Sequence, residues 1–377
     1  MIERKLRIAV LGTRGIPDVM GGIETHCNAL YPRLVAKGHS VTLFARKGYV
    51  PNNPCTCNGV RVEPLWTPKK KSLEAIFHTA YGVMFVAARR KEFDLLHVHG
   101  IGPSLLIPLA HILGLKTVMT HHGPDYDRQK WGAVAKFIIR MGERLGCRFA
   151  DAVITVSLHV RGTIKELYGC NGWYIPNGVP LPEVLPPGKT FAKFGIAPGR
   201  YVLTVGRFVP EKGFHDLLEA FRPLDTGWHL VIAGSTDHED SYSKNLRVLA
   251  ASDSRVVLTG FIKGAELGEI YSNAGLFVLP SYHEGLPIAL LEAMSYDLPI
   301  LASDIPANRE LVEETETFRV GDVDSLSKRL GGFLATPVKA ASKRARIENE
   351  FNWDLVAEET ERVYRETVAG PKRTGAI

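Results

Sequence analysis

Short runs of β-branched and apolar residues alternate with amphipathic stretches along this 377-residue chain, and the whole alternation occurs twice. This alternation is typical of a parallel sheet covered by helices. Because a chain of this length exceeds one ordinary core, the pattern predicts two α/β domains, each with its own sheet. Ligands of open parallel sheets bind outside the carboxyl ends of the strands, so two such domains predict a binding cleft between them.

Apolar runs of strand length give the expected order of the elements. In the first half, strands are predicted at 6–11, 40–44, 60–65, 95–98, 117–120, 152–156 and 173–175, with helices at 23–37, 72–91 and 133–149. In the second half, strands are predicted at 201–205, 229–233, 256–258, 276–279 and 300–302, separated by segments of helix length.

The boundary between the halves is indicated by Leu181 to Gly188, a proline-rich stretch without hydrophobic periodicity that reads as a linker. We therefore predict one domain over residues 1–180 and another over residues 189–352. Near the end of the chain, Trp353 to Val368 carries apolar residues at helical spacing and predicts a final helix.

The chain carries a net charge of +6, and the excess comes from short basic clusters at 69–71, 89–91 and 343–346. Such clusters suit an anionic lipid headgroup or a phosphorylated substrate, or they are solvated helix faces. None is long enough to predict a nucleic acid partner. The five cysteines are odd in number and scattered, which argues against a secreted disulfide scaffold. Because the N-terminus has no apolar signal region, we expect a cytoplasmic protein whose membrane contact is peripheral, at the inner face.

The most informative motif is EGLPIALLE, from Glu284 to Glu292, after the strand predicted at 276–279. It predicts a strand, a loop and a helix whose first turn holds Pro287. Free amides and the dipole at such a helix start bind phosphate. Glu292 would lie about 8 Å along the helix, within reach of a ribose beyond the phosphates. Glu284 could accept hydrogen bonds from sugar hydroxyls, although both glutamates also suit a plain helix start and a helix surface.

A second motif, GRFVPEKG, occupies 206–213 directly after the strand predicted at 201–205. An enzyme without a metal must neutralise a diphosphate leaving group with fixed cations, and Arg207 and Lys212 suit that role. Alternatively, Glu211 pairs with one of these cations at the surface. A Walker phosphate loop is excluded, because no GxxxxGK[ST] pattern occurs.

The remaining loop motifs are weaker. Gly21 and Gly22, between the first strand and the first helix, allow a ligand to approach the backbone closely. Their spacing is not GxGxxG, and no acidic residue ends the second strand, so a dinucleotide fingerprint is excluded. Glu24 faces an acceptor or simply starts the helix. The stretches 125–127 and 322–324 match the DxD pattern of metal-dependent sugar transferases, but such short matches often arise by chance.

Histidines follow two neighbouring strands of the first half, His97 and His99 on one and His121 and His122 on the next. A metal cluster is conceivable there, yet no carboxylate or cysteine lies at a familiar ligand spacing, so we predict no metal site. A histidine that contacts a sugar is the preferred functional interpretation, and simple packing is the alternative.

Together these motifs resemble those of glycosyltransferase family 4, a group of retaining transferases with the GT-B fold, over nearly the whole chain. The most specific elements are, in chain order, IPNGV at 175–179, the loop at 206–213 and the glutamates at 284 and 292. The resemblance implies two Rossmann-like domains facing a central cleft, the first for the acceptor and the second for the donor. It also implies that the C-terminal segment 353–377 crosses back to the first domain.

The resemblance assigns roles to individual residues. Arg207 and Lys212 would hold the donor diphosphate, Glu292 the ribose and Glu284 the donor sugar. His122 matches the sugar-facing histidine of the family better than His121 does, and both remain candidates. The backbone at Gly22, Leu286 and Pro287 would assist in binding the diphosphate, and Gly260 and Phe261 would lie against the nucleotide base. Gly21 and Gly285 would also contact the donor.

The implied donor is a nucleoside diphosphate sugar linked to UDP, GDP or dTDP, and no metal or other cofactor is implied. The stretch 121–131 is also similar to bacterial transferases that build surface polysaccharides, including rhamnosyltransferases. We therefore expect hexosyl or deoxyhexosyl transfer to a glycan or lipid-linked acceptor in surface polysaccharide biosynthesis. Two competing hypotheses are a non-hydrolysing UDP-sugar epimerase, which needs no acceptor, and an inactive sugar-nucleotide binding protein, which releases no nucleotide.

Overall fold

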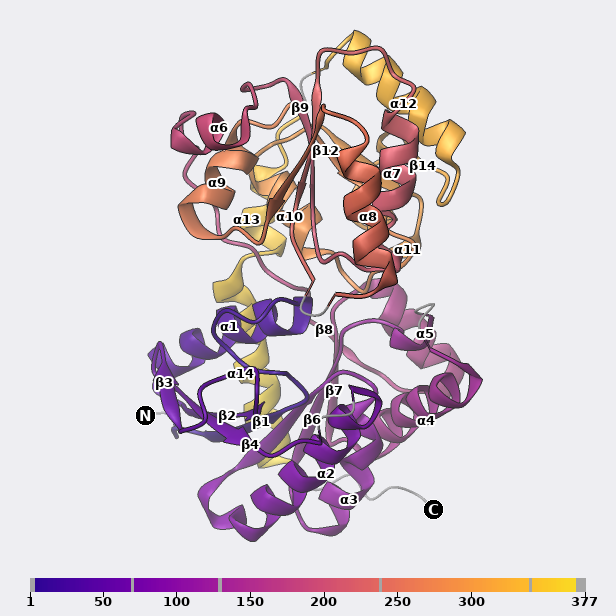
Figure 1. Ribbon diagram of the computed structural model, residues 1–377. Helices are drawn as coiled ribbons and strands as arrows, with labels where there is room; N and C mark the ends of the chain where they lie inside the picture. Colours follow the sequence, from indigo (N-terminus) through magenta and orange to yellow (C-terminus); the bar gives the residue numbers. More distant parts are fainter. Residues whose placement is uncertain (1–3, 69–70, 128–130, 237–238, 339–340, 371–377) are drawn as a thin grey trace. The chain divides into compact units, whose positions relative to one another are not determined.

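The computed structural model describes residues 4–68, 71–127, 131–236, 239–338 and 341–370. The chain divides into two compact units, each built on its own sheet (Figure 1). The first unit contains Met1–Asn177 together with Trp353–Ile377, and the second contains Gly178–Asn352.

The first unit is built on an eight-stranded sheet in the order β3-β4-β2-β1-β5-β6-β7-β8. Its strands are β1 (Arg7–Leu11), β2 (Ser40–Arg46), β3 (Cys55–Cys57), β4 (Val60–Leu65), β5 (Leu95–His99), β6 (Thr117–His121), β7 (Ala152–Thr155) and β8 (Trp173–Tyr174). The edge strand β3 is antiparallel to β4, and the other neighbours are parallel. Strands β5 and β6 are buried along their whole length, as expected of parallel strands covered on both faces.

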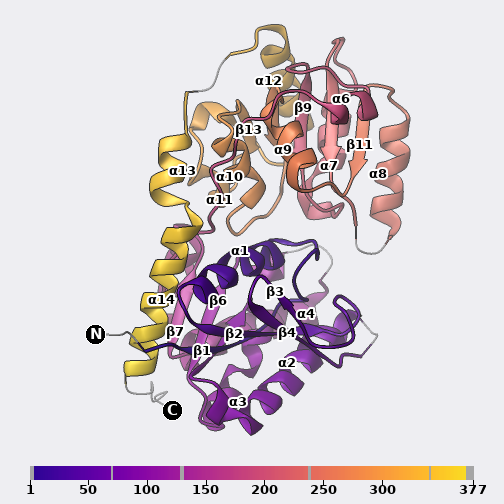
Figure 2. The same cartoon turned by 90° about the vertical axis from the view of Figure 1, so that its left-hand side faces the viewer.

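Helices cover both faces of the first sheet (Figure 2). The core on one face is formed with α1 (Gly22–Ala36) and α14 (Trp353–Ala369). The core on the other face is formed with α2 (Lys71–Ala88), α3 (Ile107–Ile112), α4 (Ala133–Phe149) and α5 (Leu158–Tyr168). Short 3-10 turns are η1 (Arg90–Glu92), η2 (Pro103–Leu106) and η3 (Asp125–Asp127).

The C-terminal helix belongs to the first unit, where the resemblance had assigned it. The hydroxyl of Tyr364 lies 2.5 Å from Nδ1 of His97 in β5, and Glu361 lies 3.1 Å from His39. Residues 371–377, the end of the predicted crossing segment, lie outside the described residues.

The second unit is built on a six-stranded parallel sheet in the order β11-β10-β9-β12-β13-β14. Its strands are β9 (Tyr201–Val205), β10 (His229–Ala233), β11 (Val256–Gly260), β12 (Leu276–Leu279), β13 (Ile300–Ser303) and β14 (Thr317–Phe318). Its helices are α6 (Lys189–Phe194), α7 (Phe214–Phe221), α8 (Ser241–Ala251), α9 (Gly264–Ser272), α10 (Ile288–Ser295), α11 (Pro306–Arg309), α12 (Val323–Ala335) and α13 (Arg344–Glu350), with 3-10 turns η4 (Pro210–Lys212) and η5 (Glu314–Glu316).

The predicted strands and helices are present, with small shifts at their ends. Strands β3 and β14 were not predicted, because segments of three and two residues are too short to show a periodicity. The helix predicted over 72–91 ends at Ala88 and is followed by η1, so its C-terminal limit was wrong.

The segment from Leu181 to Gly188 is attached to the second unit, although its composition predicts a linker. The amide of Leu185 donates to Oγ of Ser272 at 2.9 Å, and Nδ2 of Asn273 donates to the Leu185 carbonyl at 3.0 Å. Its prolines remove the hydrophobic period, but the backbone amide and carbonyl of Leu185 still find partners on Ser272, the last residue of α9, and on Asn273, which follows it.

The basic clusters form contacts within the protein. Arg89 binds Glu63 and Glu92, and Arg344 donates to the carbonyl of Ser295. These cations are therefore not simple solvated faces or free anion sites. In the cluster at 69–71, residues 69 and 70 lie outside the described residues. Among the helices that the structure describes, none is long and apolar enough to cross a membrane.

Candidate active site

The donor-side candidates lie at the carboxyl edge of the second sheet. Strand β9 leads into loop 206–213, which carries Arg207 and Lys212, and β12 leads into loop 280–287, which carries Glu284. Because β9 and β12 are neighbouring parallel strands, the two loops emerge side by side. The topology thus unites two motifs whose key residues, Lys212 and Glu284, are 72 positions apart.

Two glycines let the loops of this edge pack backbone against backbone. A Cβ added at Gly213, whose φ is +64°, would lie 2.1 Å from the carbonyl oxygen of Pro280. A Cβ at Gly234 would lie 1.8 Å from the carbonyl oxygen of Gly206. A larger residue at either position would push the Arg207–Lys212 loop away from its neighbours.

Lys212 and Glu284 form a half-buried ion pair, with Nζ 2.6 Å from Oε1. Burial alone would raise the pKa of Glu284, but the Lys212 ammonium and the Ser281 hydroxyl, also 2.6 Å away, hold its pKa below the ordinary value. Glu284 is therefore an ionised hydrogen-bond acceptor. The alternative in which Glu211 pairs with Arg207 or Lys212 at the surface is disfavoured for Lys212, whose ammonium binds Glu284.

Glu292 lies on α10, and its Oε2 accepts a hydrogen bond from the Tyr271 hydroxyl at 2.9 Å. Burial raises the pKa of Glu292 to about 7, and the hydrogen bond from Tyr271 opposes that rise. Tyr271 is held by stacking on Tyr296, with ring centroids 5.2 Å apart. Sequence reasoning missed Tyr271, since nothing in its local pattern distinguishes it from an ordinary core tyrosine.

The loop that connects β12 to α10 differs in one detail from the prediction. Pro287 is the residue before the helix, not a residue of its first turn, because α10 begins at Ile288. Proline has no backbone N–H, so a phosphate contact at this helix start has to come from neighbours such as Gly285, Leu286 and Ile288. Leu286 packs its side chain inward, with 5% of its surface exposed.

Gly260 is the last residue of β11 and Phe261 follows it, at the same edge of the sheet. Gly260 adopts φ +73° and ends the strand, and Phe261 exposes 49% of its surface. An exposed aromatic ring at the carboxyl edge offers a flat surface on which a nucleotide base can stack.

In the first unit, Gly21 and Gly22 precede or begin α1 as predicted. A Cβ at Gly21 would lie 2.1 Å from Oε2 of Glu24, whereas a Cβ at Gly22 would meet nothing within 4 Å. Glu24 itself is buried and accepts hydrogen bonds from the amide of Arg14 at 3.0 Å and its guanidinium at 3.2 Å. Glu24 therefore fixes the turn before the helix, and its carboxylate is occupied by Arg14.

The neighbouring histidines at the end of β6 have different surroundings. His121 is 1% exposed; its Nδ1 accepts from the amide of Gly123 at 3.1 Å, and its Nε2 lies 2.7 Å from Oε1 of Glu143. His122 is half-buried, and its Nε2 lies 2.9 Å from Nδ1 of His99. Both ring nitrogens of His121 are thus bonded inside the protein, which favours His122 as the histidine that faces the sugar.

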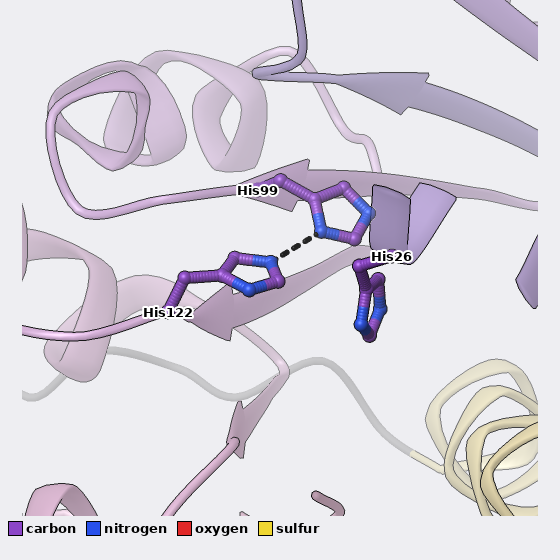
Figure 3. A group of neighbouring side chains, drawn as sticks. All are labelled: His26, His99 and His122. Carbon is purple, nitrogen blue, oxygen red and sulfur yellow. Dashed lines mark hydrogen bonds between the residues drawn. The ribbon is translucent and has the colours of Figure 1, made fainter. Parts of the chain in front are cut away.

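His122 belongs to a cluster that the sequence did not predict in this form (Figure 3). Its ring lies beside those of His99 and His26, and one ring nitrogen of each lies within 4.8 Å of the others. Burial lowers the pKa of His26 to about 4 and lowers the pKa values of His99 and His122 well below the ordinary value. His26, on α1, was missed because only the packing of α1 on the sheet brings it to the strand ends.

His97, which sequence reasoning had grouped with His99, has other partners. Its Nδ1 lies 3.1 Å from the hydroxyl of Tyr31 and 2.5 Å from that of Tyr364, and its Nε2 lies 2.7 Å from Oγ1 of Thr120. It therefore anchors α1 and α14 to β5 and stays out of the cluster.

The DxD match at 322–324 has a local explanation, because Asp322 caps α12 by accepting from the amide of Ser325 at 2.9 Å. In the other match, Asp125 begins η3, and Tyr126 packs under the guanidinium of Arg140. A structural role is thus shown for Asp322 in the second stretch.

Comparison with known families decides the class of the protein. A model described as Glycosyltransferase Family 4 matches residues 20–182, and one described as Glycosyl transferases group 1 matches residues 189–351. The chain belongs to the group 1, family 4 glycosyltransferases. Membership favours sugar transfer over the epimerase hypothesis, and it makes the carboxyl edge of the second sheet the candidate donor site of a glycosyltransferase.

The similarity extends over the whole length of known proteins. An uncharacterized glycosyltransferase of Methanocaldococcus jannaschii is 27% identical over 403 residues, covering 96% of this chain and 98% of that protein. Sucrose-phosphate synthase from Thermosynechococcus elongatus has a TM-score of 0.83 at 24% identity, covering 97% of this chain and 100% of that chain. HepE from Anabaena, solved in complex with UDP-glucose, has a TM-score of 0.77 at 19% identity, covering 96% and 100%. The predicted GT-B fold is confirmed.

Proposed function

We propose that this glycosyltransferase is a retaining, metal-independent hexosyl- or deoxyhexosyltransferase whose donor is a nucleoside diphosphate sugar. The observation that carries the proposal is the Lys212–Glu284 pair at the carboxyl edge of the second sheet, in which Lys212 comes from the loop that also carries Arg207. A cation paired with a carboxylate at a strand end can bind phosphate while the carboxylate orients sugar hydroxyls.

Each remaining part of the donor has a matching group in the second unit. Glu292 accepts hydrogen bonds from the ribose diol, and Tyr271 holds its carboxylate in place. Phe261 offers its exposed ring to a uracil, guanine or thymine base. From the first unit, we assign His122 to the donor sugar and the Gly21-Gly22 turn to the diphosphate. The complex of HepE with UDP-glucose supports this class of donor.

In the proposed reaction, the acceptor hydroxyl oxygen bonds to the anomeric carbon on the face from which the diphosphate leaves. The bond between the anomeric carbon and the phosphate oxygen breaks, and the departing phosphate oxygen takes the acceptor proton. Arg207 and Lys212 stabilise the charge that develops on this oxygen. Glu284, already bound by Lys212 and Ser281, orients the sugar and does not attack it.

A thermal-shift panel tests the donor class. We expect UDP, GDP or dTDP to raise the melting temperature, since a ligand at 100 times its Kd stabilises the folded state by about 2.7 kcal/mol. The matching monophosphate should shift it less, because it lacks the β-phosphate that Arg207 and Lys212 bind. If no diphosphate shifts the melting temperature, the proposal is wrong. Retention is checked by NMR of the product, in which the new bond keeps the anomeric configuration of the donor.

Glu292 adds a pH dependence to the same measurement. Hydrogen bonds from a ribose diol favour the carboxylate, so they lower a pKa that lies at about 7 in the free protein. Binding then releases a proton below that pH, and the affinity for the diphosphate rises with pH up to about 7 and is constant above it. The Glu292→Gln variant should bind less tightly and lose this rise, because glutamine does not titrate.

For the acceptor, we propose a glycan or lipid-linked sugar of a bacterial surface polysaccharide, reached by peripheral contact of a cytoplasmic protein with the inner membrane. An exposed apolar stripe on α2 supports this contact. Phe77, Tyr81 and Met84 expose 48%, 47% and 52% of their surfaces, and their spacing places them on one helix face. An apolar face of this kind can lie in the headgroup region of a membrane.

Co-sedimentation with phosphatidylglycerol vesicles checks the contact. We expect the protein to sediment with the vesicles, and the double variant Phe77→Asp/Met84→Asp to remain in the supernatant, since both changes place a charge in the stripe. Val248→Asp is the matched control, because Val248 is 70% exposed on a helix of the second unit. Equal sedimentation of all three proteins would contradict a role for α2.

A further inference from the structure

The cluster of His26, His99 and His122 has the composition of a metal site. Three imidazoles from α1, β5 and the end of β6 lie together, and one ring nitrogen of each is within 4.8 Å of the others (Figure 3). Tri-histidine sets bind Zn²⁺ with Zn–N distances of about 2.0–2.1 Å and leave one coordination position open.

The partners behind two of the rings already hold them in the orientation that a metal needs. Nδ1 of His26 lies 2.9 Å from Oδ1 of Asn177, which only accepts, so Nδ1 carries the proton and Nε2 has a free lone pair. Nε2 of His99 lies 2.5 Å from the hydroxyl of Tyr31, which leaves Nδ1 to face His122. Metal-binding histidines are typically fixed by such a hydrogen bond from the other ring nitrogen.

The third ring, that of His122, can join the set if the proton that it shares with His99 moves. Nδ1 of His99 and Nε2 of His122 lie 2.9 Å apart and share one proton. Two nitrogens bound to a tetrahedral Zn²⁺ lie about 3.3 Å apart, given Zn–N bonds of about 2.0–2.1 Å. A small rotation of the half-buried His122 ring therefore admits the ion, and the shared proton moves by exchange with solvent to Nδ1 of His122, so that this imidazole stays neutral when Nε2 binds the metal.

We propose that His26, His99 and His122 bind a divalent first-row transition ion, with Zn²⁺ the best fit, and that the bound ion inhibits sugar transfer. The inhibition rests on the proposed function, in which His122 contacts the donor sugar. With its Nε2 on the metal, His122 cannot offer that nitrogen to a sugar hydroxyl. Donor affinity and transfer rate then fall as the ion binds.

A Co²⁺ titration of the untagged full-length protein tests the binding. We expect one equivalent to produce the visible d–d bands of a tetrahedral site, and Zn²⁺ to displace them. His26→Ala and His122→Ala should each weaken binding at least tenfold. Asn177→Leu, which keeps all three ligands and removes the partner of His26, should weaken it by about 10- to 100-fold.

His159→Ala is the matched control, because His159 is an exposed histidine of the same unit on α5. Circular dichroism checks that each variant is folded. If His26→Ala is not folded, Asn177→Leu and His122→Ala still test the site. The site does not exist if wild-type protein leaves the spectrum of free Co²⁺ unchanged. It is also disproved if all the variants bind like His159→Ala.

Activity assays with Zn²⁺ test the inhibition separately. Transfer by the wild-type protein and His159→Ala should fall with Zn²⁺ and recover with EDTA. Asn177→Leu should need about 10- to 100-fold more Zn²⁺ for the same inhibition. Binding without inhibition would disprove the link to His122 while leaving the site intact. Because the titration uses no nucleotide sugar, failure of the proposed donor would leave the binding result unchanged.

Discussion

Replacing Lys212 with alanine is expected to lower kcat/KM for sugar transfer by about 10²- to 10³-fold, the usual effect of removing one group that stabilises transition-state charge. The ammonium of Lys212 lies 2.6 Å from Glu284, so the change removes a phosphate-binding cation and also frees the carboxylate that orients the sugar. Arg207→Ala should cause a loss of similar size by removing the other cation of the loop. Steady-state assays of nucleotide release measure both effects.

Lys193 provides a matched control for this prediction. Its ammonium lies 2.6 Å from Glu266, the same separation as in the Lys212–Glu284 pair, but its side chain is 58% exposed. Exposed pairs contribute about 1 kcal/mol or less, so Lys193→Ala should retain both activity and melting temperature. If Lys212→Ala and Arg207→Ala stay within a few-fold of this control, the two cations do not bind the diphosphate.

The periodicity of the sequence was sufficient for the architecture. Largely apolar runs such as 201–205 and 276–279 correspond to β9 and β12, because strands buried on both faces carry few polar residues and so stand out in the sequence. The motifs that follow these runs then lie at the carboxyl edge by topology alone. This is why Arg207, Lys212 and Glu284 could be grouped from the sequence.

The parts of the site that the sequence missed depend on packing between distant segments. Tyr271 reaches Glu292 from α9, and His26 reaches His122 from α1. Neither residue has a local pattern that marks it, since a tyrosine and a histidine on buried helix faces look like ordinary core residues. Only the register of each helix on its sheet decides which side chain arrives at the strand ends.

The histidine doublet shows a third kind of difficulty. Successive residues of a strand point to opposite faces, so one of His121 and His122 had to point to the side of α4 and Glu143. The sequence alone does not show which of the two histidines points to which face of the sheet. The structure shows that His121 points toward Glu143 and that His122 points toward His99.

This assignment predicts that alanine at His121 lowers mainly the stability, whereas alanine at His122 lowers mainly the activity. His121→Ala should destabilise the first unit by about 3 kcal/mol, because it leaves the buried Glu143 without its histidine partner. His122→Ala should cost about 1 kcal/mol, the net value of one lost hydrogen bond, at a half-buried position. For kcat/KM, His122→Ala should show the larger loss of the two variants. At a temperature where both variants are folded, we expect His122→Ala to lose about two- to tenfold, the effect of about 0.5–1.5 kcal/mol from a lost hydrogen bond between the neutral imidazole and the sugar.

Thermal melts and steady-state kinetics on the same preparations separate the two roles. The double variant His121→Ala/Glu143→Leu should lose less stability than the sum of its single variants, because removing both partners leaves no buried carboxylate unpaired. A large loss of activity in folded His121→Ala, with His122→Ala unaffected, would exchange the roles. His121 is 1% exposed and bonded through both ring nitrogens, so it could contact a sugar only if strand β6 were rearranged. His122 needs only a rotation of its side chain.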